Sequence, residues 1–315
     1  MSSTRSRFNP INQHWYEDLP DHQADFGRDL ESPTFADDIN AIGESYLEVS
    51  RAGNVIRGGL LMVGTVMLVF FSWVVMHLIA ASIGPDDALI FPIISWSLLA
   101  LGMTCAIFSM VLDCRIPRDM PVRFDRDKCK VYAYDYPIRL MPFPARRPKL
   151  KTFSWQDVHA EMTKQSGYNG KAYVVRYALV LVICQPGTNQ VVDRLTLKGN
   201  DMTVRGLEVL WGYIRRYMAD GTVNLPKVQP RHQGVTLRRS LFSYMPYFDP
   251  STEGSQFRNR MGAVDWLLAL VMMWFFWIWL PLGLCHYVAM KCAPEPRWPA
   301  EVDEESRRGE WKILS

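Results

Sequence analysis

The sequence predicts an α+β membrane protein, in which three transmembrane helices accompany one antiparallel β domain closed by an amphipathic helix. Three observations lead to this fold class. The 315 residues are 49% hydrophobic and 21% charged, but three long segments carry almost no charge. A strand-like alternation follows the second of these segments, and a single helical period ends that region. Such segregation is typical of a membrane protein with a sizeable folded part outside the bilayer.

Each uncharged segment is long enough to cross a bilayer, which takes about 20 apolar residues. The segments cover residues 60–83, 89–112 and 266–290. Only a short acidic turn at 84–88 separates the first two, so they are predicted to form a helical hairpin. No apolar segment lies close to the start Met, and we therefore expect the first span to act as its own insertion signal.

The distribution of Lys and Arg predicts the orientation of the spans, because cytoplasmic loops carry an excess of positive charge. The turn at 84–88 has no basic residue, whereas residues 115–151 contain eleven. The N-terminus and the middle domain are therefore expected in the cytoplasm, with the turn on the other side. A third crossing then places the tail after Lys291 outside. Re-entry at Pro281 is the alternative, although 25 residues are too few for two crossings.

These features divide the chain into six parts. They are a cytoplasmic N-terminal segment, a transmembrane hairpin, a cytoplasmic β domain, a basic and aromatic linker, a third transmembrane helix and a C-terminal tail, at 1–57, 58–113, 114–221, 222–262, 263–291 and 292–315. We expect the segment up to Asp38 to be loosely structured. Residues 38–55 are expected to form a short amphipathic helix, because their apolar residues share one helical stripe. The stripe consists of Ile39, Ile42, Tyr46 and Val49.

The middle domain alternates in the manner of antiparallel strands. One hairpin is expected around the turn at 125–127, extended segments over 152–162, and a longer hairpin over 173–197. The period then becomes helical, with an apolar stripe formed by Val204, Leu207, Trp211, Ile214 and Met218. One amphipathic helix, capped by Asp201 or Thr203 and ended by Gly221, is therefore predicted to close the domain.

No pattern in the sequence predicts catalysis. His159 and Glu161 share one face of a strand and could do acid/base work, but a solvated strand face is the more common meaning of such a pair. The loop from Gly167 to Lys171 lacks the spacing of a phosphate-binding loop. Six scattered cysteines have neither disulfide-framework nor zinc-site spacing. We therefore predict no catalytic residue, no cofactor and no metal.

Two arginine pairs are the candidate contacts with a partner or with lipid. Arg146 and Arg147 lie in the basic segment, and Arg215 and Arg216 lie on the closing helix. The basic segment could hold anionic lipid headgroups or dock an acidic protein. Nucleic-acid binding is not expected, because the net charge is only +3 and aromatic residues are not interleaved with the basic ones.

Two families share features with this sequence. The Phe124-Asp125-x-x-x-Cys129 hairpin, the Phe153-Ser154-Trp155-x-Asp157-Val158 strand and the closing helix resemble bacterial pleckstrin-homology-like domains that follow a membrane hairpin. A second segment resembles an uncharacterised proteobacterial inner-membrane family, over roughly residues 120–260. It reads Trp211-Gly212-Tyr213-Ile214-Arg215-Arg216-Tyr217-Met218, with Gly221 and Leu225-Pro226 after it.

The second resemblance implies the function. Members of that family are catalogued as a domain of unknown function and often lie near genes of type VI secretion and polymorphic toxin systems. The resemblance therefore implies a non-enzymatic protein of the bacterial inner membrane that binds a protein partner. Its most concrete form is an immunity protein against an effector toxin. A membrane-anchored lipid- or ligand-sensing or accessory module is the alternative. A pore-forming toxin is a third class, but the spans lack the polar face that it needs.

Overall fold

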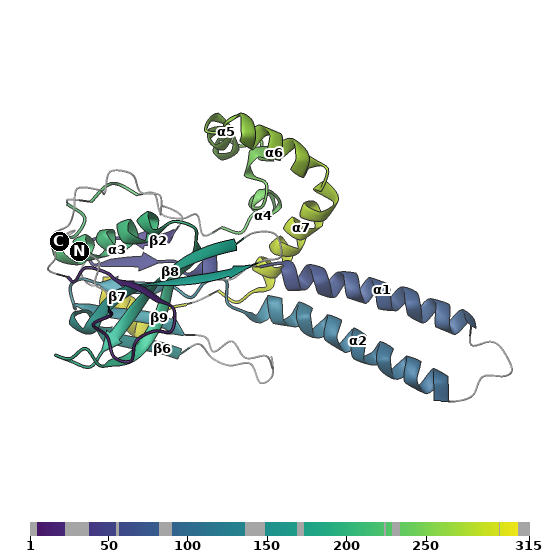
Figure 1. Cartoon of the computed structure of the whole chain (residues 1–315), viewed down its shortest axis with the longest axis horizontal. Coiled ribbons are helices and arrows are strands. Elements are labelled where there is room, and N and C mark those ends of the chain that lie inside the picture. Colours follow the sequence, from purple (N-terminus) through teal and green to yellow (C-terminus); the bar gives the residue numbers. More distant parts are fainter. Residues whose placement is uncertain are drawn as a thin grey trace.

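The computed structural model describes residues 5–22, 38–54, 57–81, 90–135, 149–168, 173–223, 225–228, 234–295 and 297–307. Within these residues, a β domain lies at one end and two long helices project from it (Figure 1). A second group of helices lies beside the base of this pair. The fold is therefore mixed α+β, as the sequence predicts.

Two antiparallel sheets make up the β domain. One has the strand order β1-β7-β8-β9 and the other the order β2-β3-β4-β5-β6. The strands are β1 (Trp15–Asp18), β2 (Ile39–Ile42), β3 (Tyr46–Val49), β4 (Val122–Asp125), β5 (Lys130–Asp135), β6 (Lys149–Ser154), β7 (Val158–Tyr168), β8 (Tyr173–Cys184) and β9 (Val191–Asp201). The predicted hairpins of the middle domain are confirmed as β4–β5 and β8–β9.

The core of the β domain lies between the two sheets and α3 (Val204–Asp220). The predicted apolar stripe faces this core, and Leu207, Trp211 and Ile214 are almost completely buried. Gly221 ends the helix with φ of +71°, a left-handed conformation that glycine adopts without steric cost. The predicted closing helix is therefore confirmed, and Thr203 is its N-cap.

The predicted helix over residues 38–55 is wrong. The segment instead forms β2, β3 and the short 3₁₀ helix η2 (Ala52–Asn54). Its apolar residues fit a helical stripe, but β3 pairs with β4, which places Leu47 opposite Phe124 in the core. This pairing joins residues that are far apart in the sequence, so a local period does not reveal it. The segment before Asp38 also contributes to a sheet, because β1 pairs with β7.

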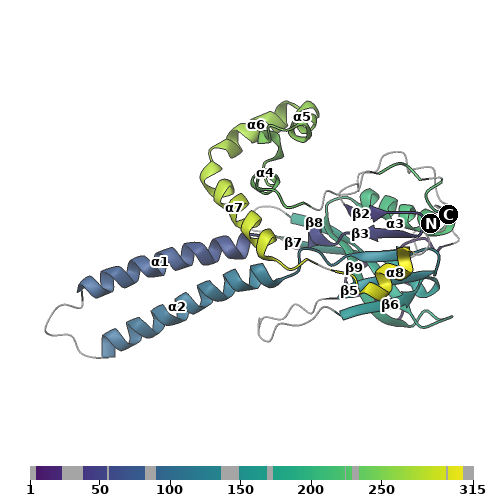
Figure 2. The same ribbon diagram turned by 180° about the vertical axis from the view of Figure 1, so that it is seen from behind.

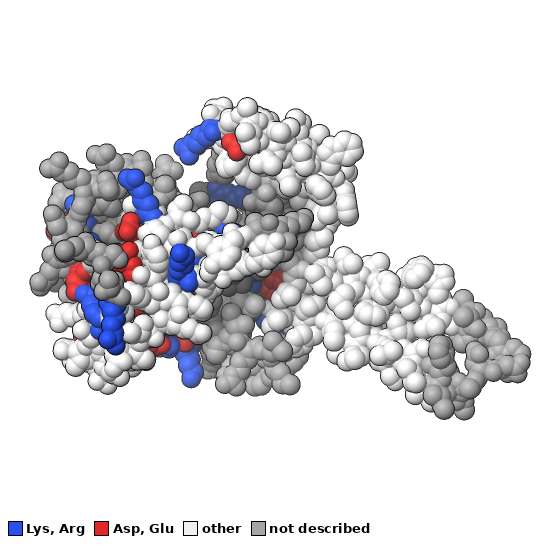
Figure 3. All heavy atoms as spheres, in the orientation of Figure 1, with Lys and Arg blue, Asp and Glu red and all other residues white. Residues whose placement is uncertain are grey.

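The two projecting helices are α1 (Gly59–Ala81) and α2 (Ile90–Arg115), and both are long and apolar enough to cross a membrane. On the face shown in Figure 3, charged side chains are scattered over the β domain, whereas the described part of the helical pair shows none beyond its base. Buried polar contacts fix its base. The Arg57 guanidinium donates to the Asp113 carbonyl oxygen at 2.9 Å, and the Asp113 carboxylate accepts from the Leu61 amide at 2.9 Å.

The third apolar segment is not one straight helix. It consists of α6 (Ala263–Met273) and α7 (Phe276–Cys292), which are bent by 86° at a short break. By length and composition, the pair is either a broken span or a re-entrant loop. Before it come α4 (Leu237–Phe242), η4 (Pro246–Phe248) and α5 (Thr252–Asn259). The sequence did not predict the break, because its residues are as apolar as those on either side.

The C-terminal tail, residues 293–307, lies on the β domain. Its helix α8 (Ala300–Arg307) covers the outer face of the five-stranded sheet (Figure 2). The Ser306 hydroxyl donates to the Asp125 carboxylate at 3.2 Å, and the Trp298 indole donates to the Glu48 carboxylate at 2.8 Å. These contacts contradict the expectation that a third crossing separates the tail from the β domain.

Candidate functional site

The N-terminal strap, residues 5–22, crosses the outer face of the four-stranded sheet and includes β1, the edge strand of that sheet. Backbone hydrogen bonds attach it at both ends, from the Asn9 amide to the Asn189 carbonyl at 2.9 Å and from the Leu19 amide to the Ala160 carbonyl at 3.0 Å. The ring of Phe8 is buried against Val182 and Cys184 of β8. The strap is therefore an integral layer of the β domain.

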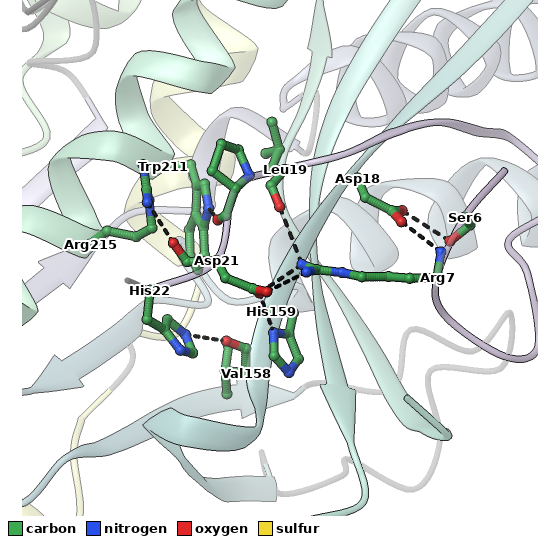
Figure 4. A network of polar contacts seen from close by, with 11 residues as sticks. Ser6, Arg7, Asp18, Leu19, Asp21, His22, Val158, His159, Trp211 and Arg215 are labelled. Atoms are coloured by element: carbon green, nitrogen blue, oxygen red, sulfur yellow. Dashed lines mark hydrogen bonds and ion pairs between the residues drawn. The ribbon is translucent and has the colours of Figure 1, made fainter. Parts of the chain in front are cut away.

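The end of the strap enters a polar network between β7 and α3 (Figure 4). Asp21 is its centre, because the carboxylate accepts from Arg7 and from Nδ1 of His159 at 2.9 Å. The Asp21 carbonyl oxygen accepts from Arg215 at 2.6 Å. Next to it, the Trp211 indole donates to the Pro20 carbonyl oxygen at 2.9 Å. The network therefore joins the strap to the helix that closes the core.

His22 follows Asp21 and lies among aromatic rings. Its Nε2 donates to the Val158 carbonyl oxygen at 2.6 Å, and its ring lies 4.3 Å from the Trp155 ring and 5.6 Å from the His159 ring. Burial lowers the pKa of His22, since the charged imidazolium is poorly solvated there, although the Val158 carbonyl partly opposes the shift.

The pKa of Asp21 is also lowered. Burial alone acts to raise it, but hydrogen bonds from Arg7 and His159 stabilise the carboxylate and outweigh that effect. The strap thus brings a neutral imidazole and an ionised carboxylate to the same place on the sheet.

The strap explains the pair that the sequence suggested for acid/base work. His159 contacts Asp21, whereas the fully buried Glu161 accepts from Asn12 at 2.8 Å and from Arg194 at 3.0 Å. The two side chains share the outer face of β7, as their spacing predicts, but the strap covers them. Their observed contacts hold the N-terminal segment in place.

A second cluster holds the C-terminal tail on the other sheet. Arg123 of β4 is only 3% exposed and pairs with Glu48 at 3.1 Å and with Asp303 of α8 at 3.0 Å. Its guanidinium also lies over the rings of Tyr46 and Trp298, at 4.3 and 4.5 Å from their centroids. Such stacking suits the planar guanidinium. The buried Arg123 side chain therefore holds the tail together with the hydrogen bonds of Ser306 and Trp298.

The clearest exposed contact surface is a set of four tyrosines and one lysine on β1 and the β7–β8 hairpin, which we call the tyrosine platform. It consists of Tyr16, Lys164, Tyr168, Tyr173 and Tyr177. The strand register places Lys164 opposite Tyr177 and Tyr168 opposite Tyr173, so these four lie on one face. The Tyr16 ring meets that of Tyr177 edge-on at 5.4 Å, and the Lys164 ammonium lies 5.5 Å from the Tyr16 ring.

The platform continues the core-facing side of the hairpin beyond the core. Met162 and Leu179 on that side are fully buried, whereas Tyr168 and Tyr173 are 70% and 68% exposed. The predicted contact residues do not include these tyrosines. Their spacing could have indicated this surface, because Tyr168 and Met162, like Tyr173 and Leu179, are an even number of residues apart and so share one face of their strand. The tyrosines therefore extend the core-facing side beyond the buried residues.

The four predicted contact residues have different surroundings. Arg215 is buried and holds the strap, and its neighbour Arg216 is half-buried on the same helix. Arg146 and Arg147 lie outside the described residues. The structure therefore gives Arg215 a position inside the fold and leaves the role of the other three as a prediction.

The described residues also define what the site can hold. In this part of the chain, no group of three or more His, Cys, Asp or Glu side chains could hold a metal ion. The six cysteines are free. The arrangement offers aromatic and hydrogen-bonding surface for a partner, with two chain ends docked on the outer faces of the two sheets.

Comparison with known proteins gives one result. The model of a family described as "Family of unknown function (DUF6708)" matches residues 99–310, which is more than half of the chain. The chain therefore belongs to this family. Searches of curated proteins and of solved structures found no match.

Proposed function

We propose that this member of the DUF6708 family is a non-enzymatic protein of the bacterial inner membrane, associated with type VI secretion or toxin delivery. In its most concrete form it is an immunity protein that binds a cognate effector toxin. The N-terminus and the β domain lie in the cytoplasm in this proposal, and α1 and α2 anchor them. The apolar length of both helices supports the anchor.

The tyrosine platform is the observation that carries protein binding. Exposed tyrosines combine a large apolar surface with a hydroxyl group and are enriched among the residues that dominate binding energy at interfaces. Tyr168 and Tyr173 lie opposite each other on two paired strands, so the sheet fixes their backbone positions before a partner arrives. Binding of a partner to these two residues therefore costs this protein little conformational entropy.

The β domain supports a pleckstrin-homology-like description in this proposal. Two antiparallel sheets enclose the core, and the helix that follows the last strand closes it. The β domain departs from the simple pattern in one respect: three of its strands, β1, β2 and β3, precede the membrane hairpin in the sequence. In this proposal the partner binds the tyrosine platform, which lies outside the closed core.

Co-expression in a sensitive bacterium tests the proposal. A toxin gene from the neighbourhood of this gene is induced with and without the full-length protein, and growth is measured. We expect specific rescue, and we expect the double variant Tyr168→Ala/Tyr173→Ala to lose it while still fractionating with the membrane. Val223→Ala, at a residue that is 86% exposed outside the platform, is the matched control and should still rescue growth.

A lipid-sensing role is the second candidate, and the position of the hairpin favours it. Figures 1 and 2 both show that the free end of the β7–β8 hairpin points towards the base of α1 and α7. Tyrosine is enriched at the membrane–water interface, where Tyr168 and Tyr173 could meet headgroups.

A photo-crosslinking amino acid at position 173 distinguishes the two roles in cells that produce the toxin. An adduct with the toxin supports immunity. Adducts with lipid alone, together with failure to rescue growth, would overturn immunity and favour the lipid-sensing role.

A further inference from the structure

The helix α6 exposes apolar side chains in almost every direction. Among the side chains of this helix, Ala269 alone is buried, and Val264, Leu267 and Leu270 are each more than half exposed. No charged residue occurs between Asp265 and Lys291. A helix that is apolar all round needs a cover of protein or of lipid.

Neither helix of the bent pair is long enough to cross a membrane alone. At 1.5 Å per residue, the 11 residues of α6 span about 16 Å and the 17 residues of α7 span about 25 Å, whereas the hydrocarbon layer is about 30 Å thick. A crossing would need the two helices end to end. The bend of 86° removes that geometry.

Both flanks of the pair are attached at the β-domain end of the molecule. Upstream, the Tyr244 hydroxyl donates to the Arg57 carbonyl oxygen at 2.7 Å, just before α1 begins. Downstream, just after α2 ends, Arg118 donates from Nε to the Met290 carbonyl oxygen at 2.6 Å and from its amide to the Pro294 carbonyl oxygen at 3.0 Å.

The views of the whole chain agree with these contacts. In Figures 1 and 2, the bend between α6 and α7 lies on the side towards which α1 and α2 project, and both outer ends of the pair lie back towards the β domain.

From these observations we infer that α6 and α7 form a re-entrant hairpin, which enters the membrane leaflet nearest the β domain with its bend first. The chain then crosses the bilayer twice, and the C-terminal tail lies on the same side as the β domain. The inference rests on the membrane anchor of the proposed function, but it does not depend on the partner. Within this hairpin, Trp274, at the bend and 79% exposed, then enters the leaflet most deeply.

Accessibility of the tail tests this topology. Two variants keep a single cysteine each: one retains Cys129, which is exposed on the β domain, and the other carries Glu301→Cys on the exposed face of α8. A membrane-impermeant maleimide is applied to sealed right-side-out and inverted vesicles. We expect both cysteines to react from the same side. Labelling of the two from opposite sides would overturn the inference.

Two native cysteines give an independent test in the full-length protein. Cys114 near the end of α2 and Cys292 at the end of α7 lie close enough for their thiols to interact. A disulfide needs Cα atoms within about 7 Å of each other, so oxidation with copper-phenanthroline should crosslink them within one chain. Cys114→Ser and Cys292→Ser should each abolish the product. A third crossing would separate the two thiols by about 30 Å and leave them reduced.

Spin labels measure the depth of the bend. Labels replace Trp274, Met76 on α1 and Val223 on the β domain, all of which are strongly exposed. We expect oxygen to be more accessible than a nickel chelate at Trp274 and Met76, and the reverse at Val223. A water-exposed label at Trp274 would overturn the re-entrant hairpin, whereas one at Met76 would overturn the anchor itself. Spin–spin broadening at Trp274 that disappears on dilution with unlabelled protein would identify a second copy as the cover and also overturn the inference.

Discussion

The strap and the described part of the C-terminal tail dock on opposite sheets of the β domain by different means. The N-terminal strap buries Phe8 and Leu19 and ends in a network around Asp21, whose side chain is 44% exposed. The C-terminal tail lies on Arg123, which is only 3% exposed and pairs with the buried Glu48 of β3 and with Asp303 of α8, whose side chain is 31% exposed. The strap is thus held by backbone and apolar contacts and by a partly solvated charge cluster, whereas the tail contacts a buried cation that is itself paired with Glu48.

Because of this difference, we expect the tail to be docked more firmly than the strap. Removal of one partner from a buried ion pair leaves an uncompensated charge and costs several kcal/mol. An exposed pair contributes about 1 kcal/mol or less, and salt and protonation modulate it. We therefore expect the tail to stay docked under all conditions in which the β domain is folded, and the strap to respond to small changes around Asp21.

The substitution Arg123→Met should have the largest effect, because it removes the buried cation on which the tail is docked. It leaves Glu48 buried without its counter-charge and removes the cation over the Tyr46 and Trp298 rings. We expect the free energy of unfolding of the β domain to fall by about 3–5 kcal/mol. Urea unfolding of the full-length protein in detergent micelles, followed by circular dichroism of the sheets, measures this loss.

The double variant Arg123→Met/Glu48→Met is the control. It removes both charges, and most of the lost stability should return because an apolar pair replaces the ion pair. A loss of less than about 1 kcal/mol in the single variant would show that the Arg123 pair behaves like an exposed one. The tail would then be no more firmly held than the strap.

The contrast between the two ends also shows how far the sequence predicts the fold. The closing helix, the β4–β5 hairpin and the hairpin of apolar helices follow from local periods, since their partners lie close in the chain. The pairing of β3 with β4 does not, because the two strands lie on either side of the α1–α2 hairpin in the sequence. Tertiary pairing overrides the helical stripe that Ile39 and Val49 suggested.

Contacts between distant segments hide the candidate site in the same way. Arg215 could be identified as a charged residue on the closing helix, but its partner, the Asp21 carbonyl oxygen, lies 194 residues earlier. The His159–Glu161 spacing predicted one shared face and gave no sign of the strap that covers it. The bend after Met273 lies within a run of uniformly apolar residues, so composition could not distinguish a straight span from a broken one.

Asp21→Asn should have an intermediate effect, confined to the strap. It removes the charge that pairs with Arg7 and His159, whose contacts are partly exposed, so the expected loss is about 1 kcal/mol or less. Hydrogen exchange of residues 5–22 should accelerate by up to about fivefold, a ratio that corresponds to 1 kcal/mol. The matched control is Asp303→Asn, which should accelerate exchange in the tail and leave the strap unchanged. Equal acceleration of both ends in either variant would argue against independent docking.

The smallest expected effect is a dependence of strap docking on pH. The charged and titratable groups around His22 are Arg7, Asp21, His159 and Arg215. Because burial lowers the pKa of His22, the folded state takes up this proton less readily than the unfolded state. The stabilisation that depends on neutral His22 is therefore fully present above its unfolded-state pKa of about 6.5. It falls as the pH drops through that value and levels off below the folded-state pKa of His22. Asp21 does not contribute in this range, since its own pKa is lowered from 3.8.

We expect the hydrogen-exchange protection factors of residues 5–22 to decrease between pH 7.5 and 5.5 by less than about tenfold, which corresponds to 1.4 kcal/mol. His22→Gln keeps a side-chain donor for the Val158 carbonyl oxygen but cannot be protonated, so its protection factors should not change over this range. The tail supplies the internal reference, because it contacts the other sheet, away from His22. If His22→Gln showed the same pH dependence as the wild-type protein, the dependence would belong to another group, and His22 would not control docking of the strap.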